Sequence, residues 1–87
     1  MRSKQAMRYF AVEAIKQVGK GKVIKIRGLY SVIYDLFPGQ CERLGFTPTY
    51  PIEEKWKKDI RFGLQDAKNQ RLIEHVGSPK SGAWKRI

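Results

Sequence analysis

The chain has 87 residues, enough for one small domain, and its 18 lysines and arginines against eight aspartates and glutamates give a net charge of +10. A charge of this size predicts a polyanionic partner, which could be DNA, RNA or an acidic membrane surface. The single cysteine, Cys41, excludes an intramolecular disulfide and a multi-cysteine zinc site. No apolar run approaches the ~18 residues of a membrane span. We therefore expect a cytoplasmic protein with no metal, no cofactor and no membrane partner.

The first half of the chain alternates between helix and strand patterns. Apolar residues at helical spacing predict a first helix from Ser3 to about Val18. Gly19 to Lys22 is typical of a turn, and the β-branched run from Val23 to Ile26 predicts a short strand. A second helix is predicted from Arg27 to Phe37, and Pro38-Gly39 should end it.

The second half predicts a loop, a long helix and a hairpin. Gln40 to Pro51 is predicted to be a long loop, and the apolar spacing from Ile52 onward predicts a third helix that ends near Asn69-Gln70. A strand from Arg71 to Val76, a turn, and a returning strand from Ala83 to Ile87 should follow. A basic helix followed directly by a hairpin is the ending of a winged helix-turn-helix domain. The predicted fold is therefore α+β: a single winged-helix domain over residues 1–87, with three helices, a small antiparallel sheet and one C-terminal wing.

The third predicted helix carries polar side chains opposite its apolar stripe. Arg61 and Gln65 lie four residues apart on this face, and Lys58 lies beside them. Arginine can fork onto guanine and glutamine can pair with adenine, so these three residues are predicted to contact DNA bases. A solvated surface is the alternative, or a structural ion pair between Arg61 and one of three acidic residues, Asp59, Glu54 or Glu74.

Other basic residues around this helix and in the hairpin suit the phosphate backbone of DNA. A phosphate contact needs positive charge and carries no sequence information. The predicted backbone contacts are Lys55, Lys57, Lys80, Lys85 and Arg86. Lys80 lies at the tip of the predicted wing.

The residue types that hydrolytic catalysis needs are not grouped in this sequence. The only cysteine and the only histidine, Cys41 and His75, lie in separate predicted elements. The acidic pair Glu53-Glu54 opens a helix, where negative charge is favourable, so it implies no metal site. We therefore expect a binding module without catalytic residues rather than an enzyme.

The segment from Trp56 to Gln65, followed by Leu72-Ile73 and Gly82 to Trp84, resembles a known family. It is similar to the winged-helix modules appended to methyl-directed restriction endonucleases, including modules that read N6-methyladenine in double-stranded DNA. The resemblance covers roughly Tyr30 to Ile87, and the matching residues are Ile60, Arg61, Leu64, Gln65, Ile73, Gly82 and Trp84. Asn69-Gln70-Arg71 replaces a glycine of the family at the helix end.

The resemblance implies a reader of N6-methyladenine in the major groove. Such a reader either lacks cutting activity of its own or is a domain of a larger nuclease or regulator, with a nuclease as a possible partner. Aromatic rings can bury a methyl group, so the candidate methyl contacts are Trp56, Phe62 and Trp84. Trp56 could instead be a core residue, and Phe62 could instead cover the first helix.

Double-stranded DNA binding would place the protein at the nucleoid. The alternatives are a sequence-specific transcriptional regulator without methyl preference, which should form a dimer on a palindromic site, and an RNA-binding protein, which should prefer an A-form duplex.

Overall fold

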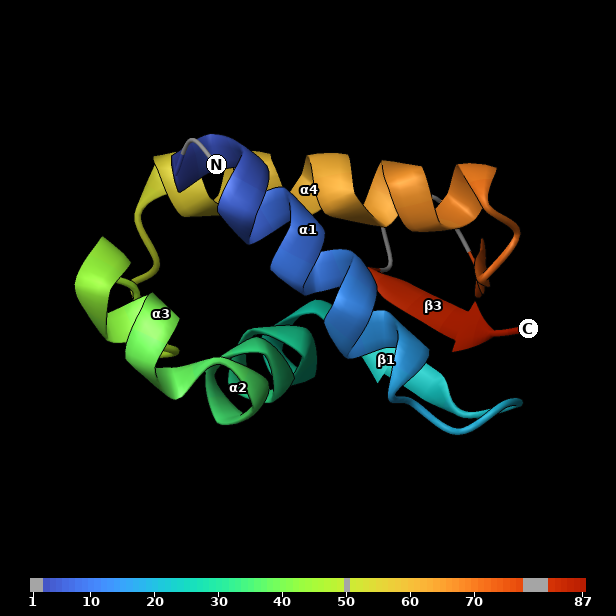
Figure 1. Cartoon of the computed structure of the whole chain (residues 1–87). Helices are drawn as coiled ribbons and strands as arrows, with labels where there is room; N and C mark the ends of the chain where they lie inside the picture. The colour runs from blue at the N-terminus through green and yellow to red at the C-terminus, as the bar shows by residue number, and fades with distance from the viewer. Residues whose placement is uncertain (1–2, 50, 78–81) are drawn as a thin grey trace.

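Two helices far apart in the sequence, α1 (Ser3–Lys16) and α4 (Glu54–Asn69), pack against each other (Figure 1). The computed structural model describes residues 3–49, 51–77 and 82–87, with side chains described from residue 6 onward. Within these residues the chain forms a compact α+β domain of four helices and three strands. Its radius of gyration is 12.0 Å, the value expected for a folded domain of this length.

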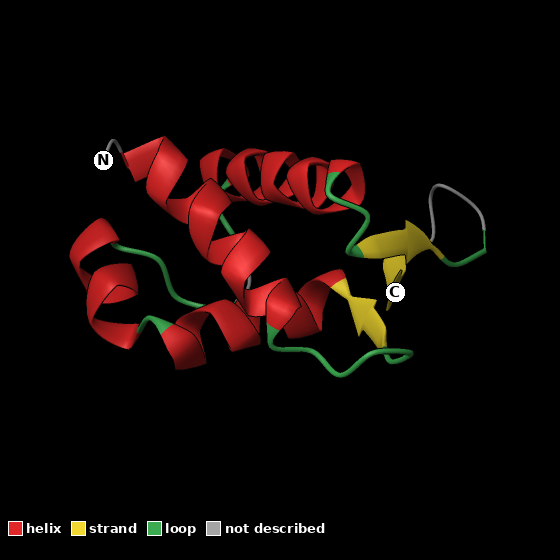
Figure 2. Cartoon of the chain, turned by 45° about the vertical axis from the view of Figure 1, so that its right-hand side comes forward, coloured by secondary structure: helices red, strands yellow, loops and turns green. Residues whose placement is uncertain are grey.

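Three elements lie between α1 and α4 along the chain: β1 (Val23–Lys25), α2 (Ile26–Leu36) and α3 (Pro38–Leu44). After α4 come β2 (Ile73–His75) and β3 (Ala83–Arg86), which complete an antiparallel sheet in the order β1-β3-β2. Both cartoon views place the sheet at one end of the molecule and α3 at the other (Figures 1 and 2).

The prediction of three helices is wrong, because Pro38 begins a helix instead of following the end of one. Proline suits the first turn of a helix, where its missing N–H has no intrahelical partner and its fixed φ is already helical. Pro38 opens α3, and Gly45 ends it in the left-handed conformation at a φ of 80°. Helix α3 therefore occupies the first part of the predicted loop from Gln40 to Pro51.

The other predicted helices and strands are confirmed with shifted ends, although β2 covers only Ile73–His75 of the strand predicted from Arg71 to Val76. The turn predicted before Ala83 lies largely outside the described residues. Helix α1 ends at Lys16 rather than Val18, and α4 begins at Glu54 rather than Ile52. Ile26 belongs to α2 and not to the first strand.

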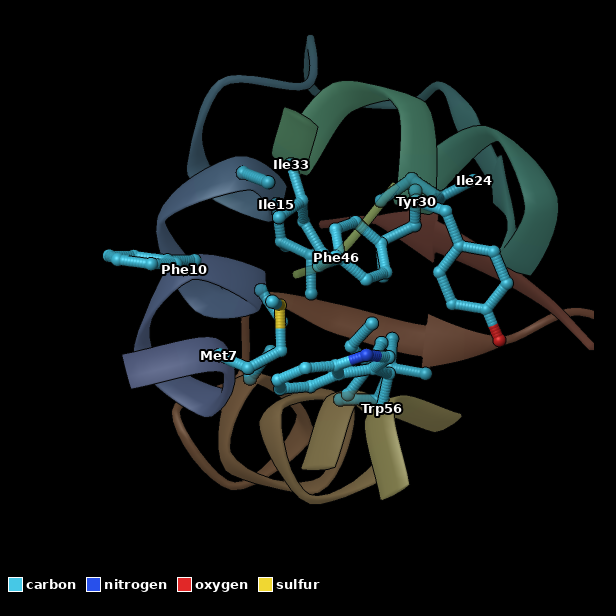
Figure 3. Close-up of a cluster of buried hydrophobic side chains, with 14 of the residues drawn as sticks. Met7, Phe10, Ile15, Ile24, Tyr30, Ile33, Phe46 and Trp56 are labelled. Atoms are coloured by element: carbon cyan, nitrogen blue, oxygen red, sulfur yellow. The ribbon is translucent and has the colours of Figure 1, made fainter. Parts of the chain in front are cut away.

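The core lies between the helices and the inner face of the sheet, and Phe46 is near its centre (Figure 3). Phe46 follows α3 and is fully buried. Its ring meets the rings of Tyr30 and Trp56 edge to face, with centroids 6.3 and 6.0 Å away. Phe46 thus fixes the chain after α3 against both α2 and α4.

Helices α1 and α4 approach each other closely at Gly63. A β-carbon at this position would lie 2.7 Å from the β-carbon of Ala11 and 2.8 Å from the carbonyl oxygen of Arg8. Contacts this short are not tolerated, so a larger residue would force the two helices apart. The absence of a side chain at Gly63 is what allows this packing.

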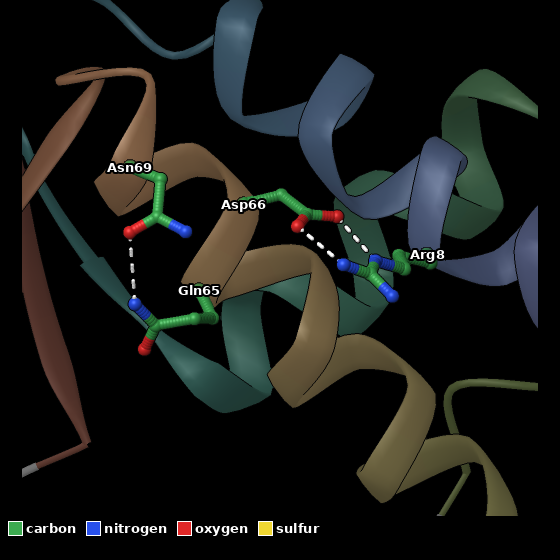
Figure 4. A network of polar contacts seen from close by, with 4 residues as sticks. All are labelled: Arg8, Gln65, Asp66 and Asn69. Atoms are coloured by element: carbon green, nitrogen blue, oxygen red, sulfur yellow. Dashed lines mark hydrogen bonds and ion pairs between the residues drawn. The ribbon is translucent and has the colours of Figure 1, made fainter.

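One turn further along, an ion pair joins the same two helices (Figure 4). The guanidinium of Arg8 donates two hydrogen bonds to the carboxylate of Asp66, one from Nε to Oδ2 and one from Nη2 to Oδ1 at 2.6 Å. The hydrogen bond from Arg8, supported by its positive charge, lowers the pKa of Asp66 below its ordinary value, and the same bond raises the pKa of Arg8. The pair supports the α1–α4 contact while the carboxylate is ionised.

We expect Gly63→Ala to destabilise the protein by about 1–3 kcal/mol, because the added methyl group overpacks the α1–α4 contact. Gly28→Ala is the matched control, since Gly28 also lies inside a helix and a β-carbon there would meet no atom of another element within 4 Å. The control should be stabilised by about 0.5–1 kcal/mol, the ordinary helix preference for alanine over glycine. Urea unfolding of both variants measures the difference, and a Gly63→Ala protein as stable as Gly28→Ala would contradict the packing argument.

We expect Asp66→Asn to lower the melting temperature at neutral pH and to have progressively less effect in acid. A carboxylate with a depressed pKa stabilises the folded state above its ordinary pKa, and this stabilisation is lost as the pH falls through the folded-state pKa. Both partners are partly exposed, so the effect should be small. The check is thermal unfolding of the parent and the variant from pH 7 down to the acid limit of folding. A difference in melting temperature that does not depend on pH would rule out the ion pair as its cause.

Candidate nucleic-acid interface

Helix α4 divides into a buried face and an exposed face. The buried residues are Trp56, Asp59, Ile60, Gly63, Leu64 and Ala67. Lys58, Arg61 and Gln65, the predicted base contacts, are all exposed on the other side of the helix. Lys68 is exposed as well and follows Arg61 by seven residues, which is two helical turns. Lys68 was not among the predicted contacts, although this spacing places it beside Arg61.

The first turns of α4 form a cluster of surface ion pairs. Lys55 lies 3.3 Å from the carboxylate of Glu53, and Lys57 lies 3.4 Å from that of Glu54. The guanidinium of Arg61 lies 4.0 Å from Glu54, with 66% of the Arg61 side chain and 82% of the Glu54 side chain exposed. Of the three acidic partners considered for Arg61, the structure pairs it with Glu54. A pair this exposed contributes little to stability, so Arg61 can leave it at small cost.

Gln65 is held by a neighbour on the same face. Its Nε2 donates a hydrogen bond to Oδ1 of Asn69 at 3.1 Å, and both residues are exposed. In Figure 4 the carbonyl oxygen of Gln65 points away from Asn69. The bond limits the rotamers of Gln65 and leaves its carbonyl oxygen able to accept another hydrogen bond.

The three candidate methyl contacts differ sharply in exposure. Trp56 is 5% exposed and Trp84 is 9% exposed, whereas Phe62 is 45% exposed. Trp56 packs in the core against Phe46, as its position on the apolar stripe allowed, and Trp84 stacks on His75 with ring centroids 3.6 Å apart. Only Phe62, among these three, has a ring with substantial exposed surface.

Phe62 also contacts the first helix. The guanidinium carbon of Arg8, on α1, lies 5.5 Å from the centroid of the Phe62 ring. This is the distance of a cation–π contact, and Arg8 is held there by Asp66. The ring is therefore positioned from one side and exposed on the other.

Lys85 lies on the outer face of the sheet, away from the core. It pairs with Val23 on β1 and with Glu74 on β2, and all three are exposed. Lys25 follows Val23 by two residues and is also exposed, so it shares this face. Lys25 was not among the predicted contacts, although strand alternation identifies it once the pairing of β1 with β3 is known.

Arg86 lies on the inner side of the same strand and is used within the fold. Its Nη1 donates to the carbonyl oxygens of Leu72 at 3.2 Å and Ile87 at 2.9 Å, and its Nε is buried without a hydrogen-bond partner. These contacts favour a structural role for Arg86 over the predicted backbone contact. Lys80, the predicted wing-tip contact, lies outside the described residues.

The junction between α4 and the hairpin is a tight helix cap. The N–H of Arg71 donates to the carbonyl oxygen of Lys68, and the N–H of Leu72 donates to that of Ala67, both at 2.9 Å. This pair of bonds is the Schellman motif, which requires a left-handed residue after the helix. That residue is Arg71, with a φ of 60°. The cap turns the chain directly from the last turn of α4 into β2.

The only cysteine and the only histidine, Cys41 and His75, are both engaged in packing. Burial raises the pKa of the Cys41 thiol to about 11, which disfavours the reactive thiolate at neutral pH. Its Sγ lies 3.9 Å from the carbonyl oxygen of Ile33, to which it donates a weak hydrogen bond. His75 stacks on Trp84 in the sheet. Among the described residues, no three histidine, cysteine or acidic side chains come together as a metal site.

No protein-family model matches the chain, and neither the curated proteins nor the solved structures contain a match. Over residues 3–49, 51–77 and 82–87, no helix has the length and apolar character needed to cross a membrane.

Proposed function

We propose that this chain is a double-stranded DNA-binding domain of the winged-helix type. Helix α4 would lie in the major groove, and the β2–β3 hairpin would contact the adjacent phosphate backbone. The observation that most supports the proposal is the exposed face of α4, which carries Lys58, Arg61 and Gln65 in a chain with a net charge of +10. The alternative, a solvated basic helix, does not account for the hairpin that follows directly.

The order of elements supports the winged-helix assignment. A winged helix places its recognition helix just before the hairpin. Here α4 precedes β2 and β3, and β3 lies between β2 and β1 in the sheet. Helix α3 is an addition to the three-helix pattern. The 16 residues of α4 span about 24 Å, and the major groove is about 12 Å wide, enough to admit a helix.

Each side chain on the exposed face of α4 has a role that its chemistry suits. Arg61 can fork onto the O6 and N7 atoms of guanine, and Gln65 can pair with adenine. Lys58 is the third candidate for a base edge. Lys55, Lys57 and Lys85 suit phosphates, because they supply charge without fixed geometry. When the protein binds DNA, phosphates would replace Glu53 and Glu54 as the partners of Lys55 and Lys57.

Recognition of N6-methyladenine is the narrower form of the proposal, and the exposure of Phe62 supports it. The methyl group on adenine N6 projects into the major groove, where Phe62 could cover it beside Gln65. Trp56 and Trp84 are too buried to take this role without rearranging the core. A separate nuclease domain or protein would then supply cleavage, as the resemblance to restriction endonuclease modules implies.

The proposal predicts that the protein binds a DNA duplex with an affinity that falls steeply as salt rises, by about 0.9 in log K for each phosphate neutralised. On the preferred site, Arg61→Ala should lose about 1–3 kcal/mol of binding free energy and much less on random DNA. Arg61→Lys, which keeps the charge but not the fork, should lose nearly as much on the preferred site. Fluorescence anisotropy at several salt concentrations measures all three proteins, with the preferred site first selected from a random duplex pool.

Three outcomes would count against this proposal in different ways. An affinity that does not change with salt would remove nucleic-acid binding altogether. A preference for an A-form RNA duplex over the matching DNA would favour the RNA-binding alternative. If Arg61→Lys binds the preferred site as tightly as the parent protein, Arg61 contacts a phosphate rather than a base.

We further expect a fully methylated duplex to bind best, a hemimethylated duplex next and an unmethylated duplex worst. Burying one methyl group against a ring contributes about 0.8 kcal/mol, so two methyl groups together should give roughly tenfold discrimination. Phe62→Ala should reduce this discrimination strongly, because it removes the exposed ring. Competition binding with the three duplexes measures the order, and circular dichroism confirms that the variant is folded.

Tyr9→Ala is the matched control for Phe62, because Tyr9 is a similarly exposed aromatic residue on α1 rather than α4. It should keep the full methyl preference. Equal affinity of the parent protein for all three duplexes would leave a DNA-binding domain that is indifferent to methylation, as in the transcriptional-regulator alternative.

A further inference from the structure

Arg71 has an unfavourable backbone conformation that no other non-glycine residue in the described part of the chain adopts. Its φ is 60°, in the left-handed region. L-residues with a β-carbon are strained there, whereas glycine is not. The helix cap that Arg71 completes uses only backbone atoms, so glycine would form it with less strain. The cap therefore does not explain why an arginine is present.

The Arg71 side chain is exposed, and its guanidinium forms no hydrogen bond or ion pair with any residue that the structure describes. Three other arginines in the fold are engaged: Arg8 binds Asp66, Arg61 lies near Glu54, and Arg86 binds backbone carbonyls. Nothing in the described part of the fold uses the guanidinium of Arg71. A strained residue with an unused functional group is a candidate for a ligand contact.

The position of Arg71 indicates which ligand. It lies between the last turn of α4 and the first strand of the hairpin. A helix of about 24 Å is longer than the groove is wide, so its ends reach the phosphates at the groove edge. The C-terminal end of a helix carries partial negative charge and would repel those phosphates. A cation at this junction offsets the repulsion.

We propose that Arg71 binds a phosphate of the DNA backbone at the edge of the groove, where α4 gives way to the hairpin. Guanidinium is well suited to this contact because it donates two parallel hydrogen bonds to a phosphate. The inference rests on the proposed DNA-binding function. The contact would link the helix in the groove to the wing, and it would explain why arginine is present at a position that favours glycine.

The test is Arg71→Gly, for which stability and binding should change in opposite directions. The variant should melt at a higher temperature than the parent, because the left-handed strain is removed. It should bind a DNA duplex on the order of tenfold more weakly. The slope of log K against log salt should also be shallower by about 0.9, the loss of one phosphate contact. Arg71→Lys should keep the salt slope of the parent.

Arg43→Gln is the charge-matched control, because it removes one exposed charge on α3, at the end of the molecule opposite the hairpin (Figure 2). It should weaken binding less than Arg71→Gly does. An Arg71→Gly protein that binds as tightly as the parent would overturn the inference, as would an equal loss in Arg71→Lys or Arg43→Gln. A parent protein that binds no duplex at low salt would instead overturn the proposed function itself.

Discussion

The close approach of α1 and α4 at Gly63 is the constraint on which the rest of the structure depends. With the β-carbon of Ala11 and the carbonyl oxygen of Arg8 against it, Gly63 lets α1 cover one side of α4. The opposite side of α4 is left exposed, with its polar and basic residues. The helix that carries the candidate interface is thus held rigidly from behind. A rigid support matters for DNA recognition, because base contacts need fixed side-chain positions whereas phosphate contacts tolerate variation.

The hairpin is fixed relative to α4 by backbone hydrogen bonds at several points. The N–H of Ile87 donates to the carbonyl oxygen of Leu72 at 2.9 Å, just after the helix cap, and β3 pairs with both β1 and β2. On the other edge, the N–H of Ile26 donates to the carbonyl oxygen of Gly82 at 3.1 Å, which ties the hairpin to the start of α2. These bonds make the exposed face of α4 and the outer face of the sheet parts of one framework. If the protein binds DNA, the relative position of the two surfaces is therefore set before binding.

Features that depend on a local sequence pattern could be predicted from the sequence. Features that depend on contacts with other elements of the fold could not. The apolar spacing of α4 is a local signal, and the helix formed where expected apart from a short shift at its start. Pro38 was misinterpreted because proline is compatible with the start of a helix as well as with the end of the preceding one. The exposure of Phe62 and the burial of Trp84 depend on α1 and on the sheet, so no local pattern distinguishes them. The left-handed conformation of Arg71 was also unpredictable, because it is imposed by the cap and not by the residue.

The ion pairs formed by the cations of α4 all lie near its N-terminal end, whereas the cations at its C-terminal end have none among the described residues. At the N-terminal end, Glu53 and Glu54 pair with Lys55, Lys57 and Arg61, and their negative charge suits the positive end of the helix dipole. At the C-terminal end, Lys68 and Arg71 have no ion-pair partner among the described residues, and their charge suits the negative end of the dipole. In the free protein, the positive charges of Lys68 and Arg71 are therefore available to a phosphate backbone where α4 meets the hairpin. If the protein binds DNA, Lys68 and Arg71 can contact phosphates without leaving a partner, whereas Lys55, Lys57 and Arg61 must first leave Glu53 and Glu54.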